Sequence, residues 1–111
     1  MGFNFQPSRV ATINVPVIGT NNPATLLRAP KDRPMRVLVR NVGGVLVFLS
    51  HDATDLATFT NASASSYRLP AGFADVFVVM PEQGMFAAAQ GAQGMISIAL
   101  SEALPAYSQE S

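Results

Sequence analysis

The chain has 111 residues and no cysteine, and its seven basic residues balance its seven acidic ones. The length fits a single domain, and the lack of cysteine excludes disulfides and thiolate metal sites. We expect neither secretion by a signal peptide nor membrane spanning, because the sequence shows no basic region followed by an apolar core and no apolar run of about 18 residues.

Charged residues make up 13% of the chain, against about 25% in an average protein. This shortage favours an assembly that hides part of the surface, although Ser, Thr, Asn and Gln could cover a monomer instead. Residues 1–50 hold six basic residues and one acidic residue, whereas residues 51–111 hold one basic and six acidic. Copies would associate head to tail if the two groups lay on different faces, but sheet pairing that mixes both signs is the simpler interpretation.

Apolar and polar residues alternate with a period of two along most of the chain, and helical periodicity is nearly absent. Pro16 interrupts the first alternating stretch, which is typical of an edge strand or a strand end. The expected strands span residues 10–18, 24–29, 35–40, 45–50, 66–69, 75–80, 85–89 and 95–101.

Two of these strands, 35–40 and 45–50, predict the clearest hairpin, because Asn41 and Gly43-Gly44 tolerate positive φ. The second of them is apolar on both faces, which predicts a central position or a cover by another element. Residues 51–66 have the composition of a long loop, with one helical turn expected around residues 53–59.

Eight short strands separated by turns every 8 to 12 residues or so predict two packed sheets. We therefore expect an all-β fold, an antiparallel β-sandwich that is jelly-roll-like, formed by residues 9–104. Residues 1–8 are interpreted as an N-terminal arm and residues 105–111 as a flexible C-terminal tail. Phe3 and Phe5 predict that the arm orders against a neighbouring subunit, with packing on its own sandwich as the alternative.

No catalytic, metal or cofactor site is expected. Ser50, His51 and Asp52 offer the residue types of a hydrolase triad, but neighbours on a strand point to opposite faces. Asp52 and Asp55 match no calcium loop and are interpreted as loop residues. A small enzyme is disfavoured by the single histidine, and nucleic-acid binding by the lack of a basic stripe interleaved with aromatics.

An Arg-rich strand and turn (RVLVRNVGG) is followed by VLVFLSHDA, YRLPAG, VFVVMPEQG and the Gly-broken pair MFAAAQGAQGMISIAL. From about Arg33 to Leu100, this order resembles small virion proteins of tailed bacteriophages, particularly the β-sandwich head-decoration, or cement, proteins. The resemblance implies a protein made in the host cytoplasm and placed on the capsid surface in many copies. It would form a dimer or trimer and bind the major capsid protein or other virion proteins.

The residues that we expect to contact partners are Phe3, Phe5, Arg9, Arg36 and Arg40. Tail-associated and fibre-associated β-domains share the same pattern, and this leaves an alternative function. In that alternative, the chain is a binding module that recognises a receptor or another virion protein through its sandwich loops, chiefly residues 51–66.

Overall fold

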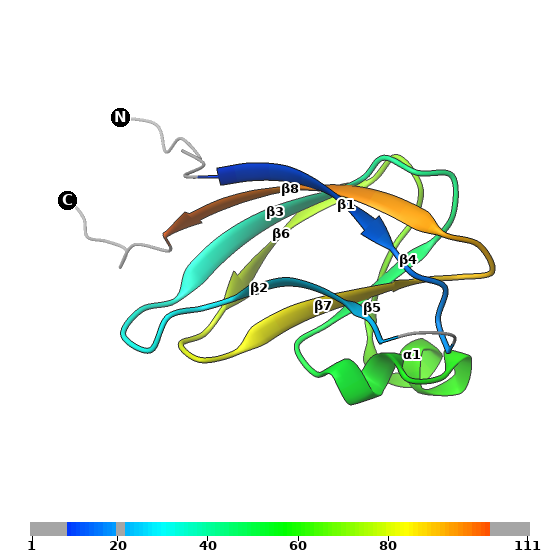
Figure 1. Ribbon diagram of the computed structural model, residues 1–111, viewed down its shortest axis with the longest axis horizontal. Coiled ribbons are helices and arrows are strands. Elements are labelled where there is room, and N and C mark those ends of the chain that lie inside the picture. Colours follow the sequence, from blue (N-terminus) through cyan, green and yellow to red (C-terminus); the bar gives the residue numbers. More distant parts are fainter. Residues whose placement is uncertain (1–8, 20–21, 103–111) are drawn as a thin grey trace.

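The computed structural model describes residues 9–19 and 22–102, which form two antiparallel four-stranded sheets packed face to face (Figure 1). Sheet A has the order β1 (Arg9–Val15), β8 (Gly94–Glu102), β3 (Met35–Asn41) and β6 (Ala74–Val79). Sheet B has the order β2 (Ala24–Arg28), β7 (Gly84–Ala89), β4 (Val47–Ser50) and β5 (Tyr67–Leu69). The expected all-β, antiparallel sandwich is thereby confirmed, whereas the proposed arm and the proposed tail lie outside the described residues.

The first strand ends at Val15, and Pro16 marks the point where the chain leaves sheet A for sheet B. The Pro16 carbonyl accepts a hydrogen bond from the Ala89 N–H, and the next residue, Val17, pairs with Ala89 in a parallel bridge. The proline therefore stands at a strand end, as its missing N–H predicts.

The expected hairpin of strands 35–40 and 45–50 is wrong, because β3 and β4 belong to different sheets. β3 pairs with β8 and β6, and β4 pairs with β5 and β7. Neither Gly43 nor Gly44 is among the residues with positive φ. Gly43 is instead needed for close approach, since a Cβ there would lie 2.9 Å from the Met95 nitrogen.

Asn41 holds the link between the two sheets. Its side chain is buried, and its Nδ2 donates to the carbonyls of Val45 (2.7 Å) and Leu69 (2.8 Å). Its Oδ1 accepts from the Gly43 N–H at 3.1 Å. One amide thus satisfies backbone groups of β5 and of the β3–β4 link, which would be costly to bury without partners.

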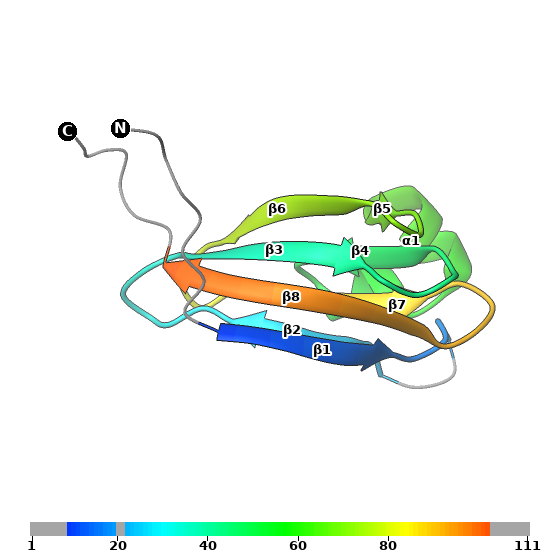
Figure 2. The same ribbon diagram turned by 90° about the horizontal axis from the view of Figure 1, so that it is seen from above.

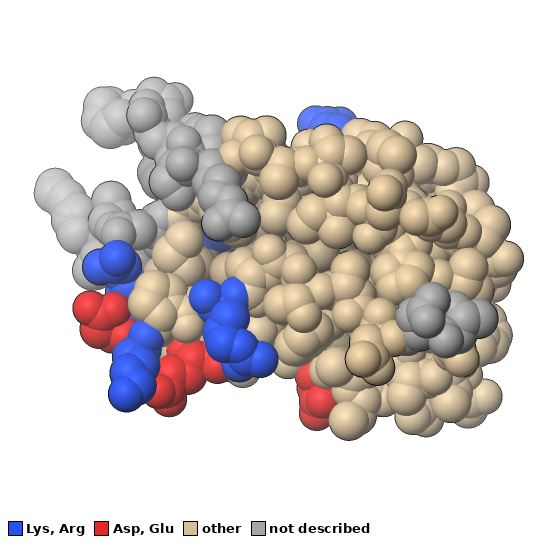
Figure 3. Space-filling view, viewed as in Figure 1, with Lys and Arg blue, Asp and Glu red and all other residues tan. Residues whose placement is uncertain are grey.

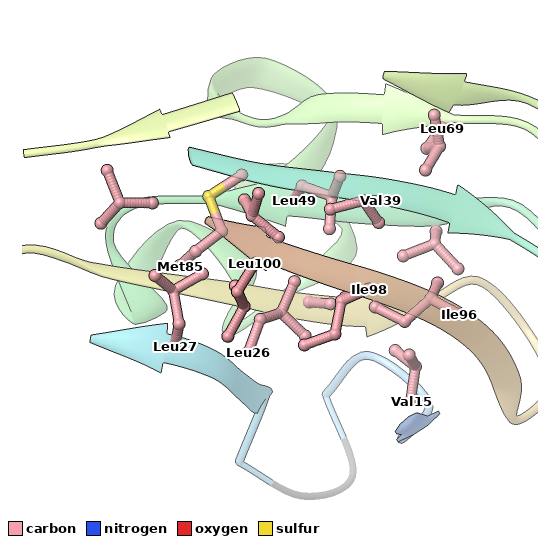
Figure 4. Packing of buried hydrophobic residues seen from close by; sticks show 14 of the residues in the cluster. Val15, Leu26, Leu27, Val39, Leu49, Leu69, Met85, Ile96, Ile98 and Leu100 are labelled. Atoms are coloured by element: carbon pink, nitrogen blue, oxygen red, sulfur yellow. The ribbon is translucent and has the colours of Figure 1, made fainter. Parts of the chain in front are cut away.

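The core lies between the sheets and consists of the inward-facing set of each strand (Figure 4). In sheet A, Val37 and Val39 of β3 are fully buried and alternate with the outward-facing Arg36, Leu38 and Arg40. The remaining large core side chains include Leu26, Leu27, Leu49, Leu69, Met85, Ile96, Ile98 and Leu100. Burial of each is worth roughly 1.5–3 kcal/mol, so this layer is the main source of stability.

The stretch expected to be a loop, residues 51–66, contains a 3₁₀ helix, η1 (Ala53–Leu56), and an α-helix, α1 (Phe59–Ser65). Asp52 caps η1, because its side chain accepts from the Thr54 N–H, and Thr58 caps α1 by accepting from the Asn61 N–H. The two helices lie against the outer side of sheet B (Figure 1). The expected helical turn is therefore present, and α1 is an addition that the composition did not predict.

These helices bury a second apolar cluster on the outer side of sheet B. Phe48 of β4 and Ala88 of β7 pack there with Leu56 of η1 and Ala62 of α1, all at most 1% exposed. The prediction that the apolar strand around residues 45–50 is central or covered is confirmed on both counts. Phe48 and the neighbouring Phe86 face this helical cover, not the opposite sheet.

Candidate partner-binding face

Among the described residues, no helix or strand covers the outer side of sheet A, whereas η1 and α1 cover that of sheet B. Seen from above, β1, β8, β3 and β6 lie side by side, and the described helices lie on the other side of the sandwich (Figures 1 and 2). We call the outward-facing residues of these four strands the sheet A face. They are Val10, Thr12, Asn14, Arg36, Leu38, Arg40, Ala74, Val76, Val78, Met95, Ser97, Ala99 and Ser101.

A row of apolar residues crosses the sheet A face from one edge to the other. The strand registers pair Val10 with Ala99, Ala99 with Leu38, and Leu38 with Val76. Val10 is 65% exposed and Val76 46% exposed. Leu38 and Ala99 between them are half-buried. An apolar row that is partly exposed on a sheet is a feature of surfaces that bind partners.

Arg36 and Arg40 flank this row on β3. Arg36 pairs with Ser101 and Val78, and Arg40 pairs with Ser97 and Ala74. Arg40 is exposed and Arg36 is half-buried. No Asp or Glu is present among the described residues of the sheet A face. The described residues of this face therefore include two basic side chains and no acidic one.

The structure brings together two of the five residues expected to contact partners, Arg36 and Arg40. Arg9 begins β1 in the same sheet, opposite Leu100, but its side chain is not described. Phe3 and Phe5 lie outside the described residues.

The apolar members of the face were not predicted as contact residues. The signal for them was available in the alternation: Leu38 stands between two outward arginines, and Val76 and Val78 share one face of their strand.

Charged side chains of both signs gather at one end of the sandwich, while much of the rest of the visible surface is uncharged (Figure 3). That end holds the link between β2 and β3 and the turn between β6 and β7 (Figure 1). The exposed charged residues of these segments are Arg28, Lys31, Asp32, Arg33 and Glu82. Arg28 Nη1 also donates to the Glu82 carbonyl at 3.0 Å. Both signs are therefore mixed at this end, through the link between β2 and β3 and the turn between β6 and β7.

Ser50, His51 and Asp52 take part in local structure. The Ser50 hydroxyl donates to Asp55 Oδ2 at 2.7 Å and accepts from the Asp52 N–H. His51 Nε2 lies 3.2 Å from the Val78 carbonyl oxygen of β6. Hydrogen bonds from the Thr54 N–H, which has the larger effect, and from the Thr54 hydroxyl lower the pKa of Asp52. Serine and histidine thus bond to different partners, and this group closes the start of η1.

The edges of the two sheets meet where Tyr67 of β5 contacts Asp75 and Phe77 of β6. The Tyr67 hydroxyl donates to Asp75 Oδ2 at 2.6 Å, and the rings of Tyr67 and Phe77 lie edge to face with centroids 5.0 Å apart. The bond from Tyr67 lowers the pKa of Asp75, helped by the Val76 N–H, and the same bond raises the pKa of Tyr67.

Side chains also bond backbone groups along β6, which is an edge strand among the described strands of sheet A. The Val76 N–H donates to Asp75 Oδ1 at 2.8 Å, and the N–H of Met80, just after the strand, donates to Gln83 Oε1. His51 Nε2 donates to the Val78 carbonyl in its Nε2-protonated tautomer. Part of the open edge of sheet A is thus occupied by the chain's own side chains.

Within residues 9–19 and 22–102, no group of three or more His, Cys, Asp or Glu is placed to hold a metal ion. No helix in that part of the chain is long and apolar enough to cross a membrane. Comparisons with protein-family models, with curated proteins and with solved structures give no match to this chain.

Proposed function

We propose that the chain is a non-enzymatic structural protein of a virion, a decoration or cement protein that binds and stabilises major capsid protein subunits. The observation that supports it best is the sheet A face, on which exposed and half-buried apolar residues lie beside two arginines in a chain that is poor in charge. Such a surface is suited to docking on another protein. The resemblance of the strand and turn order to head-decoration proteins points to the capsid as that partner.

We also propose that the sandwich is a jelly roll. The pairs β1·β8, β2·β7, β3·β6 and β4·β5 are all antiparallel, as they are when one long hairpin of eight strands is rolled into two sheets. This topology supports the relation to virion proteins, because jelly rolls are common in viral capsids.

The test of the function is co-sedimentation of the purified chain with empty shells assembled from the major capsid protein of the same genome. A decoration protein saturates the shells at a fixed ratio of copies and raises the temperature at which they break open. Shells that sediment without the chain at saturating concentration would contradict the proposal.

We further propose a dimer or trimer to which residues 1–8 contribute contacts. Light scattering on the full chain and on a chain that lacks residues 1–8 measures the native mass directly. A monomer in both cases, with equal shell binding, would contradict the role of the arm.

The second candidate is a tail-associated or fibre-associated module that recognises a receptor or another virion protein. The helical cover favours it to a limited degree, because Phe59 at the start of α1 is 50% exposed and stacks edge to face on Phe48. In that case Phe59→Ala weakens attachment to the target, and the chain is found on purified tails instead of shells.

A further inference from the structure

We infer that β1 is an assembly edge, and that it pairs antiparallel with β1 of a second copy to join two A sheets into one sheet of eight strands. This deepens the proposed dimer and rests on it, but it does not depend on which virion surface the chain binds. β1 lies at one margin of sheet A, and among the described strands of that sheet it pairs only with β8 (Figure 2). No described strand lies on its other side, where its backbone groups can pair with an added strand.

The other three edge strands of the described sandwich are each protected against such pairing. β5 has only three residues. β2 follows Pro23 directly, and its register shifts next to Thr25. Along β6, the side chains of Asp75 and His51 bond backbone groups of the edge. Short length, proline, irregular register and side chains that block the edge are the means by which sheets avoid unwanted pairing.

β1 shows none of these protective features among the described residues. It pairs with β8 in one unbroken register over all seven of its residues. Residues 10–15 include no proline, no glycine and no charged residue. A long, regular and uncharged edge strand is the kind that pairs with another chain. Of the four edges in the described sandwich, β1 is therefore the one suited to assembly.

The core is incompletely covered beside β1. Ala11 and Ile13 point inward and pack against the core, but both are only half-buried. In an antiparallel pair of β1 strands centred on Thr12, each Ala11 lies opposite Ile13 of the other copy. Side chains that are directly opposite across a strand pair lie about 4.5–5.5 Å apart at Cβ. Pairing would therefore bury apolar surface that a single copy leaves accessible at this edge.

The strand itself favours a register centred on Thr12. That register pairs all seven residues, from Arg9 to Val15, and it keeps the outward side chains of both copies on one side. Val10 then lies opposite Asn14, and Thr12 lies opposite its own copy. No like charges oppose each other within residues 10–15, and a pair of threonines is a favourable cross-strand pair. A second β1 is thus complementary to the first.

The size of the contact makes the isolated dimer weak. A seven-residue edge is about 23 Å long and two packed sheets lie about 10 Å apart, so the contact covers on the order of 300 Å² on each copy. A stable complex of standard size buries about 800 Å² on each partner. We therefore expect the dimer to dissociate below roughly 100 μM. Two joined copies present a sheet A face of twice the width, and repeated contacts on a lattice would add by avidity.

The first experiment maps the pairing with single cysteines, since the chain has none of its own. Opposite residues of an antiparallel pair have Cα atoms about 4.5–5.5 Å apart, a distance that a disulfide spans. Thr12→Cys should therefore give a covalent dimer when copper–phenanthroline oxidises the two thiols. Asn14→Cys alone should not, because the two cysteines are offset by about 13 Å along the strands. A mixture of Val10→Cys and Asn14→Cys should give the mixed dimer.

The second experiment measures association without cross-linking, by sedimentation equilibrium. Thr12→Lys and Thr12→Glu each bring like charges face to face, and each should raise the dissociation constant of the dimer at least about tenfold. An equal mixture of the two variants should restore association, because opposite charges then face each other. The matched controls Thr25→Lys and Thr25→Glu change an exposed threonine on the edge strand of sheet B and should leave the constant within about twofold of wild type. Thermal unfolding of each variant checks that the fold is intact.

The outcomes separate this inference from the proposed function. Equal cross-linking by Thr12→Cys and Asn14→Cys, or equal losses at Thr12 and Thr25, would overturn the pairing of β1 and leave a dimer formed elsewhere. Losses at Thr12 that the mixture does not restore would also overturn it. A wild-type chain that stays monomeric at millimolar concentration would overturn both the dimer and the inference. Co-sedimentation with capsid shells decides the decoration function independently in every case.

Discussion

Sheet A and sheet B share one core, but their outer sides differ in how far the described residues bury them. On sheet B, η1 and α1 bury Phe48 and Ala88, so β4 is buried on both sides. On sheet A, β3 keeps strict alternation and its outer residues, Arg36, Leu38 and Arg40, are half-buried or exposed. β4 is apolar on both faces, and other parts of the same chain bury each of them. The outer face of β3 mixes apolar and charged residues and can contact another protein.

The largest expected effect tests whether the cover of sheet B is as firmly packed as the core. Phe48→Ala should lower the free energy of unfolding by about 3–5 kcal/mol, because it empties a fully buried site under the helices. Val76→Ala on the sheet A face should cost less than about 1 kcal/mol. Urea unfolding measures both, and a large loss for Val76→Ala would mean that the sheet A face is already covered.

The connection between the sheets is tested at Asn41. Asn41→Ala removes the donor to the Val45 and Leu69 carbonyls and should cost about 2–4 kcal/mol, while the Gly43 N–H keeps its second acceptor, the Met95 carbonyl. Asn41→Asp should be at least as damaging at neutral pH, because a carboxylate then faces two carbonyl oxygens. The stability lost in Asn41→Asp should be smaller in acid, where the protonated carboxyl regains a donor. Urea unfolding at two pH values measures this, and a larger loss of stability in acid would contradict the expectation.

A smaller effect is expected where the helical cover begins. Thr58→Ala removes the side-chain cap of α1 and should cost about 1 kcal/mol, whereas Thr58→Ser keeps the hydroxyl and most of the stability. Hydrogen exchange should show faster opening in α1 than in the strands of sheet A. Equal acceleration across both sheets would mean that the cover and the sandwich unfold as one unit.

The smallest effect concerns the edge where the sheets meet. The lowered pKa of Asp75 adds stability above the ordinary carboxyl value of 3.8 that is lost as pH falls through the folded value. The raised pKa of Tyr67 adds stability below 10.0 that is lost as pH rises through its folded value. Tyr67→Phe should raise the pKa of Asp75 in an NMR titration and leave the pKa of Asp52 unchanged. A parallel shift of Asp52 would indicate a global change.

Alternation and turn residues were enough to predict all eight strands, since each half-buried strand carries its own period of two. They were not enough to predict strand pairing. The hairpin of residues 35–50 failed because β3 and β4 each find two partners far along the sequence. Gly43 between them serves a close contact with Met95 instead of a tight turn.

The helix α1 escaped prediction because its sequence, FTNASAS, has poor helix propensity and only one buried residue, Ala62. Its cap, Thr58, was the available signal. For the candidate site, the arginines could be predicted as exposed charges. Their position on one face with Val10 and Ala99 could not be predicted, because it depends on which strands become neighbours in the sheet.

The side chains along β6 affect whether the protein polymerises at high concentration. An open strand edge offers the same pattern of donors and acceptors to any extended segment, including the same strand of another copy. In this chain, Asp75 occupies the Val76 N–H and His51 meets the Val78 carbonyl. Strand-by-strand polymerisation must first break these bonds, so light scattering on concentrated solutions should show no growing fibres even though the strand sequence, ADVFVV, is one that pairs readily.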